Sequence, residues 1–244
     1  MEITSHPSPK FQEEGEILLV DKPLDWTSFD VIQRLRNCWG IRKAGHSGTL
    51  DPKATGLLIV CTGRQTKSID QFANLEKEYT GTFQIGIQTP SFDLETEVTQ
   101  RSDCSGVTLE LLESTVKRFV GRQLQTPPMY SAVKHHGKPL YEYARRGKTL
   151  DRKPKHIEIH ELSILSFAPP EVSFRVVCSK GTYIRSLVSD IGAALGCGAT
   201  LIALRRTRIG SFRVEDARTI EELERLKDER GLLRNVGHEH RIPA

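Results

Sequence analysis

The stretch GHSGTLDPKATG at residues 45–56 places one carboxylate, Asp51, between a leucine and a proline, with glycines on both sides. Pro52 fixes its own φ and disfavours helical backbone in the residue before it, so Asp51 is expected to be extended. The flanking glycines allow tight turns and a close approach of another molecule to the backbone. The unbroken apolar run at 57–61 is typical of a buried strand. A single acid on a stiff loop beside a core strand suits a nucleophile, although an Asx-type turn that caps the strand produces the same pattern.

Length and composition are those of an ordinary globular protein. The 244 residues can bury a sizeable core, and 37% of them are hydrophobic. No apolar run approaches the roughly 20 residues needed to span a bilayer, and the polar N-terminus lacks the apolar centre of a signal peptide. Five scattered cysteines indicate reduced thiols and therefore a cytoplasmic protein. We expect a disordered tail at 1–15, one domain over 16–234 and a flexible tail at 235–244.

Hydrophobic periodicity predicts strands on both sides of the loop. Continuous or alternating apolar residues predict strands at 17–20, 57–61, 79–87, 157–159 and 172–178. A short helix or turn is expected at 200–204.

Helices are expected at several places, and most begin at a recognisable cap. One helix begins at Thr27 or Ser28 and ends at Gly40, one follows Thr108, and one follows the Thr219–Glu222 capping box. Two more are expected at 66–74 and 184–195, and Arg185 lies off the apolar stripe of the latter. The first helix is expected to bury Phe29, Ile32, Trp39 and either Leu35 or the stem of Arg36.

Basic and aromatic residues gather between residues 125 and 155, where we expect at most one short helix, near 141–146. This mixture suits phosphate neutralisation combined with base stacking, whereas a solvated charged surface is the alternative. A second basic cluster lies at Arg205, Arg206 and Arg208. The cations of the first segment are Lys134, Lys138, Arg145, Arg146, Lys148, Arg152 and Lys153.

Sequence patterns for several other chemistries are missing. The chain has no phosphate-binding P-loop motif, no dinucleotide-binding glycine fingerprint, no Cys-x-x-Cys zinc pair and no Gly-x-Ser-x-Gly hydrolase motif. The histidines at 135–136 and 238–240 are expected to be solvated rather than to bind a metal. The remaining candidates for functional groups are an acid, tyrosines, arginines and the basic segment.

Five blocks, in order, resemble TruB-type tRNA pseudouridine-55 synthases, and together they cover roughly residues 17–212. The block at 45–56 closely resembles the family signature. Asp25 stands where the first block usually has glycine, and Ser47 where threonine is common. The other blocks are Asp21-Lys22-Pro23 with Thr27-Ser28, Lys77-Glu78-Tyr79, the stretch at 125–134, and the stretch at 178–185 continued by Leu204-Arg205-Arg206.

The resemblance implies an α+β pseudouridine synthase fold, with a mixed, mostly antiparallel sheet flanked by helices and a basic RNA-clamping insertion at about 125–155. It implies conversion of uridine 55 in the TΨC loop of tRNA to pseudouridine by a monomer that needs no cofactor, metal or protein partner. The chain corresponds to a short form without the family's PUA-type C-terminal domain, so tRNA binding is expected to be weaker or more salt-sensitive. Two alternatives are a non-catalytic tRNA-binding or folding module, and the same chemistry directed to another tRNA position or a guide-RNA complex.

The resemblance also assigns roles to individual residues. Asp51 corresponds to the nucleophile, Arg185 to an arginine that keeps this acid charged and oriented, and Tyr79 to a tyrosine implicated in proton transfer. His46 corresponds to a residue that stacks in the space left by a flipped-out base, and Lys22 to one that supports the Asp51 loop, with a surface lysine as the alternative. The further substrate-binding residues are Tyr183, Leu204, Lys134, Arg145 and Arg146.

Overall fold

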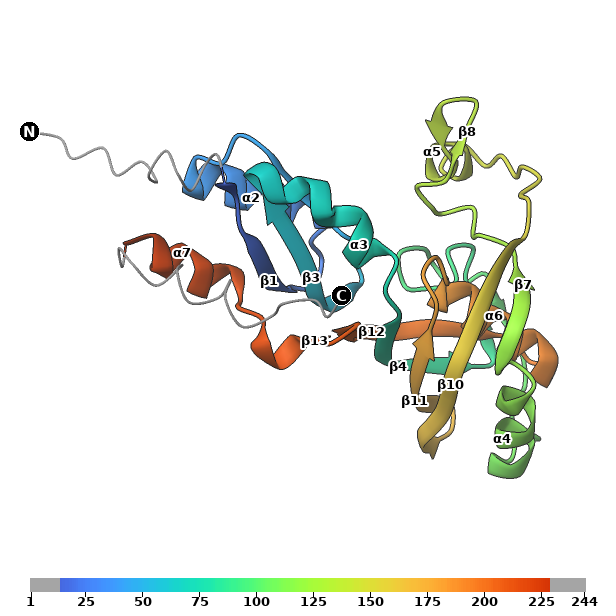
Figure 1. The fold of residues 1–244 in the computed structure, drawn as a ribbon. Coiled ribbons are helices and arrows are strands. Elements are labelled where there is room, and N and C mark those ends of the chain that lie inside the picture. The colour runs from blue at the N-terminus through green and yellow to red at the C-terminus, as the bar shows by residue number, and fades with distance from the viewer. Residues whose placement is uncertain (1–13, 229–244) are drawn as a thin grey trace, which may run out of the picture. The chain divides into compact units, whose positions relative to one another are not determined.

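The computed structural model describes residues 14–228, which form two compact units (Figure 1). Unit 1 comprises 14–75 and 205–228, and unit 2 comprises 76–204. Strand β12 (Ala199–Ile209) passes from unit 2 into unit 1.

The division into two units does not test the predicted domain boundaries. A single domain over 16–234 remains a prediction. The tail predicted at 235–244, and all but the last two residues of the tail predicted at 1–15, lie outside the described residues.

Unit 1 is built on strands in the order β1-β3-β12, to which β12 contributes its second half. Strands β1 and β3 pair antiparallel, β2 pairs with β3, and β13 pairs with β12. The elements of this unit are β1 (Ile17–Lys22), α2 (Ser28–Trp39), β2 (Ala44–His46), β3 (Ala54–Thr62), η1 (Gly63–Ser68), α3 (Ile69–Ala73), β13 (Phe212–Arg213), η2 (Val214–Asp216) and α7 (Ile220–Asp228).

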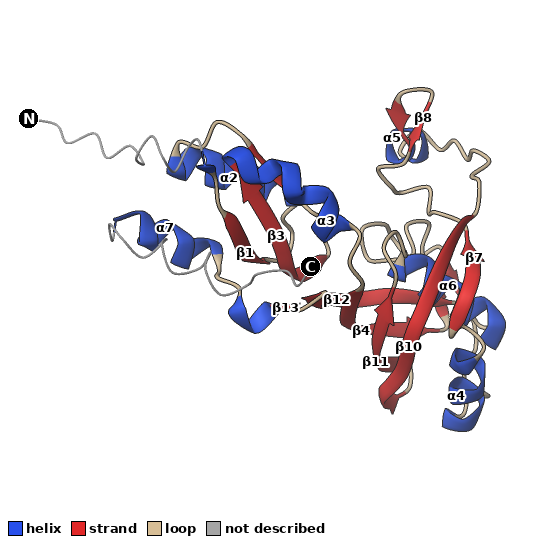
Figure 2. Ribbon diagram, in the orientation of Figure 1, coloured by secondary structure: helices blue, strands red, loops and turns tan. Residues whose placement is uncertain are grey.

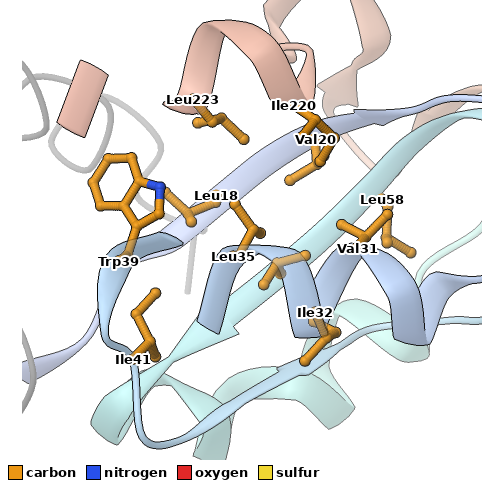
Figure 3. Packing of buried hydrophobic residues seen from close by; sticks show 11 residues of the cluster. Leu18, Val20, Val31, Ile32, Leu35, Trp39, Ile41, Leu58, Ile220 and Leu223 are labelled. Carbon is orange, nitrogen blue, oxygen red and sulfur yellow. The ribbon is translucent and has the colours of Figure 1, made fainter. Parts of the chain in front are cut away.

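The two predicted core strands are continuous apolar runs because both of their faces are covered. Along β1, Leu18 and Val20 enter one hydrophobic cluster, whereas Leu19 enters another. Figure 3 shows the first cluster, in which side chains of α2 and α7 meet those of β1 and β3. The second cluster contains Phe72 of α3 and Phe212, whose rings meet edge to face. The strand predictions at 17–20 and 57–61 are confirmed.

Helix α2 has the predicted ends, and its predicted buried face is confirmed at Ile32, Leu35 and Trp39 but is wrong at Phe29. Thr27 caps it through a capping box with Asp30, and Gly40 ends it in the left-handed conformation. Phe29 was predicted to be buried, but it is 65% exposed. Ser28 and Val31, which were not predicted, complete the buried stripe.

The strands of unit 2 pair in the order β12-β4-β11-β10-β7, and β12 also pairs with the strands of unit 1 (Figure 2). Strand β11 pairs antiparallel with β4 and β10, and β10 pairs antiparallel with β7. The strands are β4 (Lys77–Ile85), β5 (Ile87–Gln88), β6 (Gln100–Arg101), β7 (Gly121–Gln125), β8 (Lys134–His135), β9 (Lys138–Pro139), β10 (Lys155–Ala168) and β11 (Glu171–Cys178). The helices are α4 (Leu109–Lys117), α5 (Leu140–Ala144) and α6 (Ile184–Leu195).

The helices and strands predicted in unit 2 are present, with one clear exception. The short helix predicted near 141–146 is α5, and the helix predicted at 184–195 is α6. The short helix or turn predicted at 200–204 is wrong, because these residues form part of β12. That strand finds partners far along the chain, and local propensity does not report them.

The α+β class is confirmed, with mostly antiparallel pairing and flanking helices. Isolated parallel bridges join Val20 to Arg218 in unit 1 and Asp93 to Leu201 in unit 2. No helix among residues 14–228 is long and apolar enough to cross a membrane.

Candidate active site

The Asp51 loop connects β2 to β3 in unit 1, and backbone hydrogen bonds fix it at both ends. The Ser47 N–H donates to the Ile59 carbonyl at 3.0 Å, and the Ala54 N–H donates to the Asp51 carbonyl at 3.0 Å. Asp51 itself is only partly buried. The loop therefore has a fixed backbone and leaves the side chain of Asp51 partly accessible.

Arg206, on β12, braces the same loop from inside unit 1. Its side chain is 1% exposed; Nε donates to the Leu57 carbonyl at 2.7 Å and Nη2 donates to the Gly48 carbonyl at 3.0 Å. The neighbouring Arg205 forms a two-pronged ion pair with Asp21 at 3.0 and 2.6 Å. Two of the three arginines in the second basic cluster, Arg205 and Arg206, are thus engaged in contacts within unit 1.

Gly56 is required by strand packing rather than by the approach of another molecule. Its φ is +101°, and a Cβ there would lie 2.3 Å from the carbonyl oxygen of Arg206. Only glycine allows the β3 and β12 backbones to come this close. Gly56 thereby places Arg206 beside the loop that Arg206 braces.

Lys22 lies at the end of β1 and is not a surface lysine, since its side chain is 0% exposed. Its Nζ donates to the carbonyls of Pro23 at 2.8 Å and Trp26 at 2.5 Å. Burial lowers the pKa of Lys22 from its usual value near 10.5 to about 8. The Asp51 carboxylate opposes this shift in pKa, and the Arg206 guanidinium adds to it.

The lowered pKa of Lys22 predicts how stability changes with pH. Because the folded-state pKa is about 8 and the usual value is near 10.5, the unfolded chain binds more protons between these pH values. The contribution of Lys22 to stability therefore rises with pH in this window, by at most about 1.4 kcal/mol per pH unit. Urea unfolding at pH 7.5 and 9 should show this gain in the wild type and a smaller gain in Lys22→Met. Equal pH dependence in the two proteins would contradict the assignment.

His46, at the end of β2, presents a half-buried ring next to the loop. Its Nδ1 accepts a hydrogen bond from the Gly48 N–H at 3.3 Å. Burial lowers the pKa of His46, and repulsion by Arg206 acts in the same direction. The ring is therefore neutral at physiological pH, a form suited to stacking on a nucleobase.

Arg185, in the first turn of α6, belongs to unit 2 and is 3% exposed. Nη1 donates to the Ser91 carbonyl at 2.9 Å and Nη2 donates to the Tyr130 carbonyl at 2.8 Å. Nε lies 3.5 Å from Oδ2 of Asp93. The sequence pattern places Arg185 off the apolar stripe of this helix and does not identify the polar partners that allow its burial.

The tyrosines and Leu204 also lie in unit 2. The backbone of Tyr183 is held by the Gln125 side chain, which accepts from its N–H at 2.8 Å and donates to its carbonyl at 3.0 Å. Tyr79 is buried on β4 opposite Val176, and Leu204 is buried on β12. Gln125 and Asp93 position predicted site residues but were absent from the predicted site. Gln125 stands in a block that resembles the family, and that block was the available signal.

Three predicted RNA-binding cations lie exposed in the segment between β7 and β10: Lys134, Arg145 and Arg146. Arg145 lies 5.4 Å over the Tyr141 ring and 3.4 Å from Glu95. Tyr143 donates its hydroxyl to the His135 carbonyl at 3.3 Å. The clamping role of this segment remains a prediction.

Among residues 14–228 no group of three or more histidines, cysteines, aspartates or glutamates is arranged to hold a metal ion. The histidines at 238–240 lie outside these residues.

Comparison with known proteins decides the family. The N-terminal domain of TruB family pseudouridylate synthases matches residues 36–184, and the C-terminal domain of tRNA pseudouridylate synthase B matches residues 185–236. The chain belongs to the TruB family of pseudouridylate synthases.

Relatives of this TruB-family chain match along most of their length. The tRNA pseudouridine synthase B of Flavobacterium johnsoniae is 48% identical over 217 residues, covering 86% of this chain and 95% of the relative. The tRNA pseudouridine synthase B of Chlorobium luteolum is 49% identical over 223 residues, covering 89% of this chain and 77% of the relative. A solved structure of a Cbf5-Nop10-Gar1 complex superposes with a TM-score of 0.72 at 29% identity, and the alignment covers 93% of this chain but 60% of that one.

Proposed function

We propose that this TruB-family enzyme isomerises uridine 55 in the TΨC loop of tRNA to pseudouridine, with Asp51 as the nucleophile. Relatives that share about half of its residues carry the name tRNA pseudouridine synthase B, which supports tRNA as the substrate class. The observation that supports Asp51 as the nucleophile is the structure of its loop. The backbone is fixed on both sides of a carboxylate that is only partly buried.

The reaction rearranges the substrate without changing its atomic composition. The bond between C1′ of the ribose and N1 of uracil breaks, the detached base rotates, and a bond forms between C1′ and C5. The proton on C5 is released and N1 gains one, so the product is an isomer. A carboxylate can form a covalent adduct in this sequence or stabilise the detached-base intermediate, and both require the ionised form of Asp51.

The other predicted site residues have supporting roles in this proposal. Tyr79 takes part in proton transfer at the base, Arg185 keeps the acid charged and oriented, and Tyr183 and Leu204 line the uracil pocket. Flipping the target nucleotide out of its loop costs a few kcal/mol, and stacking of the neutral His46 ring offsets part of this cost.

Binding of the tRNA is assigned to exposed cations. Lys134, Arg145 and Arg146 are exposed and suited to contact phosphates of the T-arm. The enzyme is proposed to act as a monomer without an obligatory protein partner, in the cytoplasm where its tRNA substrate matures.

A matched pair of transcripts tests the proposal. Pseudouridine should appear at position 55 of an unmodified tRNA transcript and should be absent when that uridine is replaced by cytidine. A binding or folding module would bind both transcripts and modify neither. Pseudouridine at a different position would contradict the assigned target and leave the chemistry intact.

A further inference from the structure

The start of helix α2 contacts the Asp51 loop through one hydroxyl group. Ser28 Oγ accepts a hydrogen bond from the Leu50 N–H at 2.8 Å and donates one to the Leu50 carbonyl at 3.2 Å. Both residues are buried, with Ser28 2% and Leu50 3% exposed. A single side chain thus satisfies both backbone groups of the residue that precedes Asp51.

The turn before α2 holds the other side of Asp51. The Asp25 N–H donates to the Pro52 carbonyl at 2.9 Å, and the Asp25 carboxylate pairs with Lys53 at 2.7 Å. Asp25 has a φ of +63°, which is the conformation that glycine adopts most easily and explains why the family block usually has glycine there. The Asp51 carbonyl accepts from Ala54, so three consecutive carbonyls, at 50, 51 and 52, are each fixed by a different donor.

We propose that Ser28 is a positioning residue for Asp51, acting through the backbone of Leu50. This inference rests on the proposed role of Asp51 as the nucleophile. The Asp25 contact is made by a backbone N–H that any non-proline residue supplies, whereas the Ser28 contact needs a hydroxyl. Alanine at position 28 would leave the buried N–H and carbonyl of Leu50 without partners, and the segment would shift to recover them.

A small shift of this loop has a large effect on rate. A reacting group displaced by about 1 Å typically lowers the rate by about 100-fold. Binding of the T-arm is assigned above to exposed cations, whereas Ser28 is buried and 2% exposed. Loss of the Ser28 hydroxyl is therefore expected to lower kcat and to leave KM nearly unchanged.

Thr27→Ala provides the matched control for Ser28→Ala. Thr27 Oγ1 caps the same helix by accepting a hydrogen bond from the Asp30 N–H at 3.0 Å. This contact of the Thr27 side chain is therefore made to the first turn of α2. Both variants should lower the melting temperature. Ser28→Ala should lower kcat by about 10- to 100-fold with KM changed less than about 2-fold, whereas Thr27→Ala should retain kcat within about 2-fold. Ser28→Thr, which keeps the hydroxyl, should recover most of kcat.

The outcomes separate this inference from the proposed function. Wild-type enzyme that forms no pseudouridine overturns the proposed function. An active wild type with equal kcat in Ser28→Ala, or with the same loss of kcat in Thr27→Ala, overturns the positioning role alone. If Ser28→Ala does not fold, amide hydrogen exchange of the wild type tests whether the Leu50 backbone is held. The Leu50 amide should be strongly protected, and exchange at the rate of an unstructured peptide would overturn the inference.

Discussion

Asp51→Asn is expected to abolish pseudouridine formation while the T-arm stem-loop still binds. The amide keeps the size of the side chain, but it carries no charge and is a poor nucleophile, so it can neither form the adduct nor stabilise the detached base. Loss of a nucleophile in enzymes that depend on one lowers kcat by about 10⁴-fold or more, and we expect a loss of this order. Single-turnover conversion of a labelled T-arm stem-loop measures the rate, and filter binding measures affinity.

The matched control is Asp70→Asn, which makes the same chemical change at an exposed position on α3 of the same unit. Its activity should equal that of the wild type. Retention of activity in Asp51→Asn within about tenfold would identify another group as the nucleophile. A parallel loss of binding and activity would assign Asp51 to substrate binding instead.

Local signals predicted the ends of elements better than their buried faces. Thr27 and Gly40 delimit α2 as expected, because capping depends on a few neighbouring residues. The error at Phe29 arose because an apolar stripe about 100° wide can be drawn through either Phe29 or Val31. Ser28 settles the choice, since its hydroxyl must face the buried Leu50. A serine such as Ser28 indicates which face of a helix is buried only when its hydrogen-bond partner, here Leu50, is known.

Strand β12 illustrates a different limit. Its residues do not alternate cleanly, and the arginines within it suggest a surface. Arg206 is nevertheless buried, because its acceptors on Leu57 and Gly48 lie 149 and 158 residues earlier in the chain. A guanidinium is tolerated inside a protein when its donors meet fixed acceptors. Sequence periodicity contains no trace of such a pairing.

The candidate site also has residues that the sequence predicts and supporting contacts that it does not. Asp51 stands out from the sequence alone, as an acid before proline on a glycine-rich loop, and the resemblance adds Lys22, His46, Tyr79 and Arg185. The groups that hold these residues were not predicted. The acceptors of Arg185 lie 94 and 55 residues away along the chain, whereas those of Lys22 are backbone carbonyls of the adjacent turn. The structure shows how Lys22 and Arg185 are accommodated without solvent, and the catalytic roles themselves stay predictions that the variants test.

Arg185→Met should strongly destabilise the protein and abolish activity. Methionine fills a similar volume, but it leaves Asp93 buried without its ion-pair partner and removes the donors to the Ser91 and Tyr130 carbonyls. Breaking a buried ion pair from one side costs about 3 to 5 kcal/mol. Urea unfolding measures this cost. Lysine at position 185 should also be deficient, because it cannot place donors at three separate acceptors in the fixed geometry of a guanidinium.

A second substitution separates the structural role of Arg185 from its catalytic one. Asp93→Asn removes the carboxylate that Arg185→Met leaves behind, so the double variant should be more stable than Arg185→Met by about 1 to 3 kcal/mol. If Arg185 serves the reaction, the double variant regains stability and stays inactive. If the arginine only supports the fold, activity returns in proportion to stability. Recovery of stability without activity therefore assigns Arg185 to catalysis, because no loss of folding then accounts for the lost rate.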